Sequence, residues 1–180
     1  MIHYNIMINN IIFKNINFFR NIYLSIYIMN LNTLICTIKE NINNTTEIME
    51  KYNGNEWKDY LLSIMPIDKT SYKKIAIDKN DIFEVYLIFW FYDAVSPIHD
   101  HPNEGCIMKI IEGELIEDTY QNNGDYSSTF IQRNILNKNL IANRFGNEIL
   151  HQIFNKTELT VSLHVYFPPN FKHNIYIGKK

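Results

Sequence analysis

The chain has 180 residues, which is the size of one ordinary domain and is enough to bury a hydrophobic core. Hydrophobic residues make up 46% of it and charged residues 20%, proportions typical of a soluble globular protein. The formal charge of −2 leaves no basic excess, which argues against binding to nucleic acid or to an anionic membrane surface. The two cysteines, Cys36 and Cys106, are too few for a disulfide framework and favour a reducing cytoplasm.

Residues 1–28 differ in composition from the rest. They contain no acidic residue, and Asn, Lys14 and Arg20 interrupt every apolar window long enough to span a bilayer, so we reject a transmembrane helix. A transit peptide stays open, although Arg and Ser are few. The alternative is that Met29 is the true start and that the leader is disordered or not translated. We expect residues 29–180 to form a single domain.

Between residues 31 and 64 the spacing of apolar residues predicts short helices. Intervals of three and four residues join Leu31, Leu34, Ile35, Ile38 and Ile42. Thr45 or Thr46 can cap a second helical turn, and a third helical face runs from Trp57 to Ile64, before Pro66. These segments form a helical lead-in.

After Pro66 the sequence favours β-strands. Residues 83–92, 106–112, 127–132 and 160–167 are rich in aromatic and β-branched residues and are separated by turn signals. Many short strands without long intervening helices predict an antiparallel sandwich or barrel.

His99 and His101 form a candidate metal chelate. Alternate side chains of a strand share a face, so both imidazoles can point into a barrel while Asp100 points away. Taken alone, an HxH pair is more often structural than metal-binding, because histidine is a frequent satisfied polar residue.

A third histidine, His151, lies about fifty residues further on. The sequence now resembles the two-motif pattern of the cupin barrel. The first motif is the HxH pair with the strand that ends at Gly113, and the second is the HxxxN of His151 and Asn155. Cys106 stands where that pattern has Glu. The missing carboxylate leaves three neutral imidazoles, a site with room for an anionic ligand such as a thiolate.

Ser162, His164 and Tyr166 alternate with apolar residues along one predicted strand. Three polar groups on one face are costly inside a core unless they bond one another. The alternative is that this face is simply solvated.

Residues 96–115 (SPIHDHPNEGCIMKIIEGEL) and 161–169 (VSLHVYFPP) resemble the cysteine dioxygenase family, thiol dioxygenases of the cupin superfamily. The resemblance runs from about Leu31 to about Pro169. It implies a mainly β protein with an antiparallel jelly-roll barrel behind a short α-helical lead-in. It also implies a cytoplasmic monomer that converts L-cysteine and O2 to cysteine sulfinic acid, in cysteine catabolism and taurine biosynthesis.

The resemblance also assigns roles to residues. His99, His101 and His151 correspond to the ligands of one Fe(2+). Cys106 and Tyr166 correspond to a pair that forms a thioether crosslink, a protein-derived cofactor. Ser162 and His164 complete a relay that positions the Tyr166 hydroxyl. Tyr72 corresponds to an aromatic residue at the carboxylate end of the substrate, and Trp90 to a packing residue.

One departure affects the choice of substrate. The family has Tyr-x-Arg, with the Arg holding the substrate carboxylate, where this chain has Tyr72-Lys73-Lys74. Lys74 supplies charge without a planar fork. Arg133 or Arg144 could substitute for it, although surface positions are the simpler interpretation of both, and we assign His173 to the surface or to a disordered segment.

Three alternatives to a cysteine dioxygenase therefore stay open. The first is a dioxygenase for another small thiol, of the 3-mercaptopropionate or cysteamine type. The second is a non-catalytic metal-binding cupin. The third is another cupin enzyme, with zinc or manganese in the site.

Overall fold

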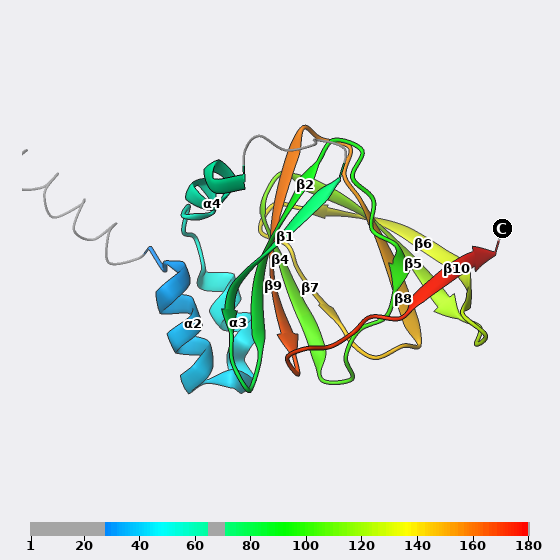
Figure 1. Ribbon diagram of the computed structural model, residues 1–180, viewed down its shortest axis with the longest axis horizontal. Coiled ribbons are helices and arrows are strands. Elements are labelled where there is room, and N and C mark those ends of the chain that lie inside the picture. Colours follow the sequence, from blue (N-terminus) through cyan, green and yellow to red (C-terminus); the bar gives the residue numbers. More distant parts are fainter. Residues whose placement is uncertain (1–27, 65–70, 180) are drawn as a thin grey trace, which may run out of the picture.

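The computed structural model describes residues 28–64 and 71–179 (Figure 1). The predicted leader, residues 1–28, therefore lies outside the described residues except for its last one. In chain order the described elements are α2 (Leu31–Glu40), η1 (Ile42–Asn44), α3 (Thr45–Lys51), α4 (Trp57–Ile64), β1 (Tyr72–Lys79), β2 (Glu84–Phe91), β3 (Ile98–His99), β4 (Gly105–Glu112), β5 (Glu114–Asn122), β6 (Ser127–Asn137), β7 (Ile141–Arg144), β8 (Ile149–Phe154), β9 (Leu159–Phe167) and β10 (Ile175–Lys179). None of the helices in these ranges is long and apolar enough to cross a membrane.

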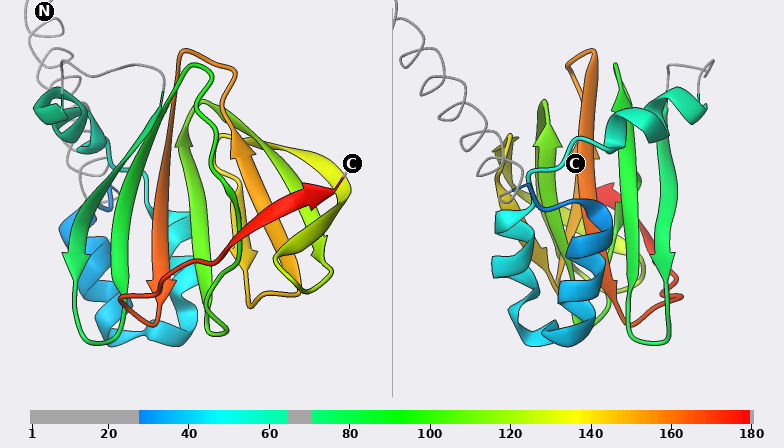
Figure 2. Two further views of the ribbon diagram at one scale, coloured as in Figure 1. Left: turned by 45° about the vertical axis from the view of Figure 1, so that its right-hand side comes forward. Right: turned by 90° about the vertical axis from the view of Figure 1, so that its left-hand side faces the viewer.

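The strands form two sheets that together enclose a barrel. The first has the order β1-β2-β9-β4-β7, and the second, β10-β3-β8-β5-β6, closes on itself. The pairings between named strands are antiparallel apart from β10 with β6. The helices lie outside, against the first sheet (Figure 1; Figure 2, right). The predicted antiparallel cupin barrel with a helical lead-in is confirmed.

Strand β9 separates the hydrophobic core from the barrel interior. Val161, Leu163 and Val165 are fully buried in the cluster that also contains the apolar faces of α2 and α3. Successive side chains of a strand point to opposite faces, so Ser162, His164 and Tyr166 point into the barrel. Because β2 and β4 hydrogen-bond to the two edges of β9, this polar row lies in the middle of the sheet.

A buried lysine ties the helices to the sheet. Lys109 on β4 is 2% exposed, and its Nζ donates to the carbonyl oxygens of Met49, Glu50 and Tyr52 at 2.8, 2.9 and 2.7 Å. These carbonyls belong to the C-terminal end of α3, where helical carbonyls lack partners within the helix. The ammonium therefore caps α3 and fixes the lead-in against β4.

The four predicted strands correspond to β2, β4, β6 and β9. Strands β1, β5, β7, β8 and β10 were not predicted. β7 and β10 are short, and β5 is buried on both faces over residues 117–120, which removes the alternation that marks a half-exposed strand.

Candidate metal centre

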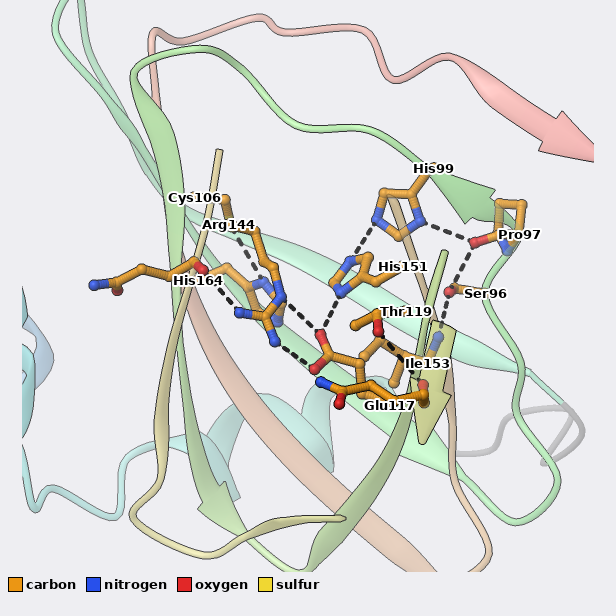
Figure 3. A network of polar contacts seen from close by, with 12 residues as sticks. Ser96, Pro97, His99, Cys106, Glu117, Thr119, Arg144, His151, Ile153 and His164 are labelled. Carbon is orange, nitrogen blue, oxygen red and sulfur yellow. Dashed lines mark hydrogen bonds and ion pairs between the residues drawn. The ribbon is translucent and has the colours of Figure 1, made fainter. Parts of the chain in front are cut away.

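Three histidines meet inside the barrel. His99 on β3 is the register partner of His151 on β8, and His101 follows two residues after His99. One ligand atom from each of the three lies within 4.8 Å of the others. Figure 3 shows a ring nitrogen of His99 directed at a ring nitrogen of His151.

The hydrogen bonds of two rings fix their tautomers. His99 Nδ1 lies 2.9 Å from the carbonyl oxygen of Pro97, and His151 Nδ1 lies 2.8 Å from the Glu117 carboxylate. Both partners only accept, so each Nδ1 carries the hydrogen and each neutral ring has a lone pair on Nε2. The two Nε2 atoms are 3.1 Å apart. Two lone pairs at that distance repel unless a cation lies between them.

Burial keeps all three rings neutral. It lowers the pKa of His99 to about 4 and also lowers the pKa values of His101 and His151. The buried Nδ1 of His101 has no hydrogen-bond partner in the described ranges. Neutral imidazoles are the form that binds metal, so the donor set fits a divalent ion such as Fe(2+), and equally Zn(2+).

A buried ion pair stands behind His151. The Glu117 side chain is fully buried and accepts from His151, from Arg144 Nε at 2.8 Å and from a terminal nitrogen of Arg144 (Figure 3). A carboxylate on the far nitrogen of a histidine orients the ring and raises its basicity. The surface interpretation of Arg144 is wrong, because its side chain is 23% exposed and lines the cavity in front of the histidines. Sequence reasoning missed Glu117, since nothing local marks its pairing with residues 27 and 34 positions away.

The polar row on β9 forms a hydrogen-bonded chain. Trp90 Nε1 donates to Ser162 Oγ at 2.9 Å, and Ser162 Oγ lies 2.8 Å from His164 Nε2. Within the described part of the chain, Nε2 is the acceptor available to the Ser162 hydroxyl, so His164 carries its hydrogen on Nδ1. His164 Nδ1 lies 3.5 Å from Tyr166 Oη and 3.8 Å from Cys106 Sγ, so its hydrogen is directed toward these two atoms. The packing role predicted for Trp90 therefore includes a hydrogen bond.

Cys106 and Tyr166 are direct cross-strand partners on β4 and β9. Burial raises the pKa of the Cys106 thiol to about 12 and raises that of the Tyr166 phenol well above 10. Both groups are therefore protonated at neutral pH, and each can donate a hydrogen bond. The neighbouring strands hold the two side chains together without any help from loops.

Lys74 and Tyr72 reach the same interior from β1. Lys74 Nζ lies 3.9 Å from the ring centroid of Tyr86 and 4.2 Å from that of Tyr166, so the ammonium stands between two aromatic faces. Burial lowers its pKa, and the coulombic effects of Cys106 and Glu84 oppose that shift. The Tyr72 ring packs on Trp90 with a centroid distance of 4.8 Å.

The prediction that His173 is a surface residue is also wrong. Its ring centroid lies 4.9 Å from that of His99 and 5.6 Å from that of Tyr166. It is held there by Asp100, which follows His99 directly and is itself 2% exposed.

One cavity of about 240 Å³ collects these residues. The predicted site residues that line it are Tyr72, Lys74, His99, His101, Cys106, His151, His164 and Tyr166, while Ser162 lies behind His164. The structure thus brings together the predicted set and adds Arg144 and His173 to it. An antiparallel barrel with three convergent neutral histidines defines a cupin with a candidate mononuclear metal centre.

Comparison with known proteins identifies the family. The family model for cysteine dioxygenase type I matches residues 22–177, so the chain belongs to this family. Cysteine dioxygenase type 1 from Bos taurus is 31% identical over 136 residues, and the human protein is 30% identical over the same length. Each match covers 72% of this chain and 66% of the relative, slightly less than two thirds of its length. Among solved structures, a double-stranded β-helix protein from Klebsiella pneumoniae aligns with a TM-score of 0.48 and 18% identity, over 63% of this chain and 90% of its own.

Proposed function

We propose that this chain is an iron-dependent thiol dioxygenase that converts L-cysteine and O2 to cysteine sulfinic acid. Both oxygen atoms are added to sulfur, which loses four electrons while dioxygen gains four, so no further reductant is needed. A ferrous ion held by His99, His101 and His151 would supply the coordination of the thiolate and the activation of dioxygen. The protein would bind and orient the substrate and exclude water from it.

The observation that carries this proposal is the combination of neutral donors with Cys106 and Tyr166 in one cavity. No Asp or Glu is among the described residues that line it, and Glu117 is hidden behind His151 and paired with Arg144. A divalent ion on three neutral imidazoles keeps its full charge and therefore favours an anionic ligand. A deprotonated thiol has that character.

Tyr166 would supply a directed hydrogen bond. The chain from Trp90 through Ser162 to His164 offers an N–H to the phenolic oxygen, so the Tyr166 hydroxyl hydrogen is left for Cys106 or for a ligand in the cavity. A donor fixed in a water-poor site stabilises developing negative charge on oxygen more than the same donor in water. Ser162 and His164 are therefore positioning residues in this proposal.

Lys74 and Tyr72 would hold the substrate carboxylate. Lys74 Nζ has no carboxylate within salt-bridge distance among the described residues, and it lines the cavity beside Tyr166. A cation without an anionic partner beside a small cavity suits an anionic group of the substrate.

Cys106 and Tyr166 would form the thioether crosslink. The step joins Sγ to the ring carbon beside the hydroxyl and removes one hydrogen from each partner. Dioxygen takes the two electrons and two protons and leaves as hydrogen peroxide. Their direct opposition across β4 and β9 supports it, since side chains at such positions come within a few ångströms of one another.

A dioxygenase for another small thiol is the second candidate. Lys74 is a point charge between two rings and cannot grip a carboxylate in two places as Arg does. This weakens the case for an α-amino acid and leaves 3-mercaptopropionate and cysteamine as candidate substrates.

Oxygen uptake tests both candidates. The purified chain is loaded with Fe(2+) without oxygen and then given dioxygen with L-cysteine, 3-mercaptopropionate or cysteamine, and the product is identified by its mass. We expect the fastest uptake with L-cysteine and a product heavier by two oxygen atoms. Metal binding without uptake on any thiol would refute the dioxygenase and favour the non-catalytic cupin, and a His99→Ala variant with full activity would refute the ligand assignment.

A further inference from the structure

His173 is a fourth histidine of the cavity, outside the group of three. It lies in the segment between β9 and β10, which crosses the mouth of the barrel (Figure 1, red). Its ring is edge-on to those of His99, Tyr166 and Phe171, at centroid distances of 4.9, 5.6 and 5.2 Å. The ring lines the same cavity as the predicted site residues.

Asp100 fixes the orientation of this ring. His173 Nδ1 lies 2.7 Å from the backbone carbonyl oxygen of Asp100, and the Asp100 carboxylate accepts from the backbone and side-chain nitrogens of Asn174 at 2.8 and 2.7 Å. A carbonyl oxygen only accepts, so Nδ1 carries the hydrogen and the neutral ring presents a lone pair on Nε2. In the described part of the chain this Nε2 has no hydrogen-bond partner.

Among the polar groups that line the cavity, an acceptor for a substrate amine has still to be found. Lys74, beside Tyr166, is suited to an anionic group, but the described lining contains no carboxylate that would accept from an amine. His164 Nε2 is engaged by Ser162, and His99, His101 and His151 are the three candidate metal ligands. His173 Nε2 is thus the ring nitrogen with a lone pair left for the organic part of a substrate.

We infer that His173 accepts a hydrogen bond from the amino group of the thiol substrate and makes this enzyme select aminothiols over thiol acids that lack an amine. The inference rests on the proposed function and deepens it. Lys74 and His173 each lie against the Tyr166 ring and would hold the two ends of an α-amino acid, the carboxylate and the amine. Asp100 links this selectivity to the metal centre, because it lies between two of the histidines and carries His173.

Substitution of His173 separates the two substrate classes. His173→Leu removes the acceptor but retains an apolar side chain, and His173→Gln offers an amide oxygen in its place. We expect His173→Leu to lower kcat/KM about tenfold for L-cysteine and cysteamine, mainly through KM, and to leave 3-mercaptopropionate within about twofold. His173→Gln should recover part of the loss. Phe171→Leu, which loosens the packing of the same ring without changing its acceptor, should leave the ratio between the two classes unchanged.

Anaerobic titration of each thiol into the Fe(2+)-loaded protein gives a readout that does not need turnover. We expect His173→Leu to weaken binding of L-cysteine about tenfold and to spare 3-mercaptopropionate. Equal losses for both thiols, or no loss for L-cysteine, would overturn the inference. Absence of oxygen uptake in the unmodified protein would count against the proposed function alone, since the binding ratio still tests His173.

Discussion

The pairing of Glu117 with His151 leads to a sharp prediction about metal affinity. In Glu117→Gln one amide oxygen replaces two carboxylate oxygens that accept from His151 and from Arg144. If the amide oxygen keeps His151 and Arg144 Nε, the amide nitrogen faces the remaining Arg144 donor. If the amide turns over, its nitrogen faces His151. In both orientations the variant lacks the negative charge that makes the His151 ring a stronger metal ligand.

The size of the effect follows from burial and charge. Removing a hydrogen-bonded carboxylate behind a metal-binding histidine weakens metal affinity by about 10- to 100-fold, or roughly 1.4 to 2.8 kcal/mol. Arg144 is also left without its anion, and because Glu117 is fully buried we expect the free energy of unfolding to fall by about 2 to 3 kcal/mol. The metal-binding and stability losses are measured separately.

Competition with a chromophoric chelator, without oxygen, measures the affinity for Zn(2+) or Fe(2+). Asp118→Asn is the matched control, because Asp118 is the next residue on β5 and accepts two hydrogen bonds from Arg133 at 2.6 and 2.7 Å. Among the residues that the structure describes, no hydrogen bond joins Asp118 to a histidine. We expect the control to bind metal within about twofold of the unmodified protein. An unchanged affinity in Glu117→Gln, or an equal loss in Asp118→Asn, would refute the reasoning.

Three further changes test other parts of the structure. Lys74→Arg should lower the KM for L-cysteine about three- to tenfold, because Arg can grip the carboxylate at two points, and an unchanged or higher KM in steady-state oxygen uptake would count against that role. Lys109→Met should lower the free energy of unfolding by about 3 kcal/mol, because three carbonyls of α3 lose their donor, and thermal unfolding should show a Tm lower by about 6 to 12 °C with metal affinity unchanged. After aerobic turnover, intact-mass measurement should find the unmodified chain lighter by two hydrogens than its sequence and Cys106→Ser at its full sequence mass; a full mass for both would exclude the crosslink.

The parts of the site that the sequence predicted are those governed by local periodicity. The alternation of Ser162, His164 and Tyr166 with valine and leucine follows from the pleat of a strand that has the helices on one side and the barrel interior on the other. The helix-side core covers one face of β9 and the barrel closes over the other, so the polar row had to be satisfied internally. A local pattern therefore predicted a buried network, although its partner Trp90 comes from another strand.

Glu117 was missed, and Arg144 and His173 were assigned to the surface or, for His173, to a disordered segment, because long-range pairing determines their positions. Arg144 and Glu117 are each typical of a surface when taken alone, and burial becomes favourable only because the two charges meet within the barrel. His173 follows two prolines in a segment without periodicity, and its place depends on Asp100, more than seventy residues earlier. No spacing rule within one segment carries that information.

Asp100 connects the candidate metal centre to the segment that carries His173. Its neighbours His99 and His101 supply two of the three converging nitrogens, so the backbone at residues 99–101 must be held rigidly. The Asp100 side chain points away from them and accepts from Asn174 and Tyr176, which anchors β10 and the segment before it. Because the Asp100 carbonyl also holds His173, a shift of this segment would move the outer wall of the cavity and the two histidines together. The selectivity that we infer for His173 would thereby be coupled to the geometry of the candidate metal centre through a single residue.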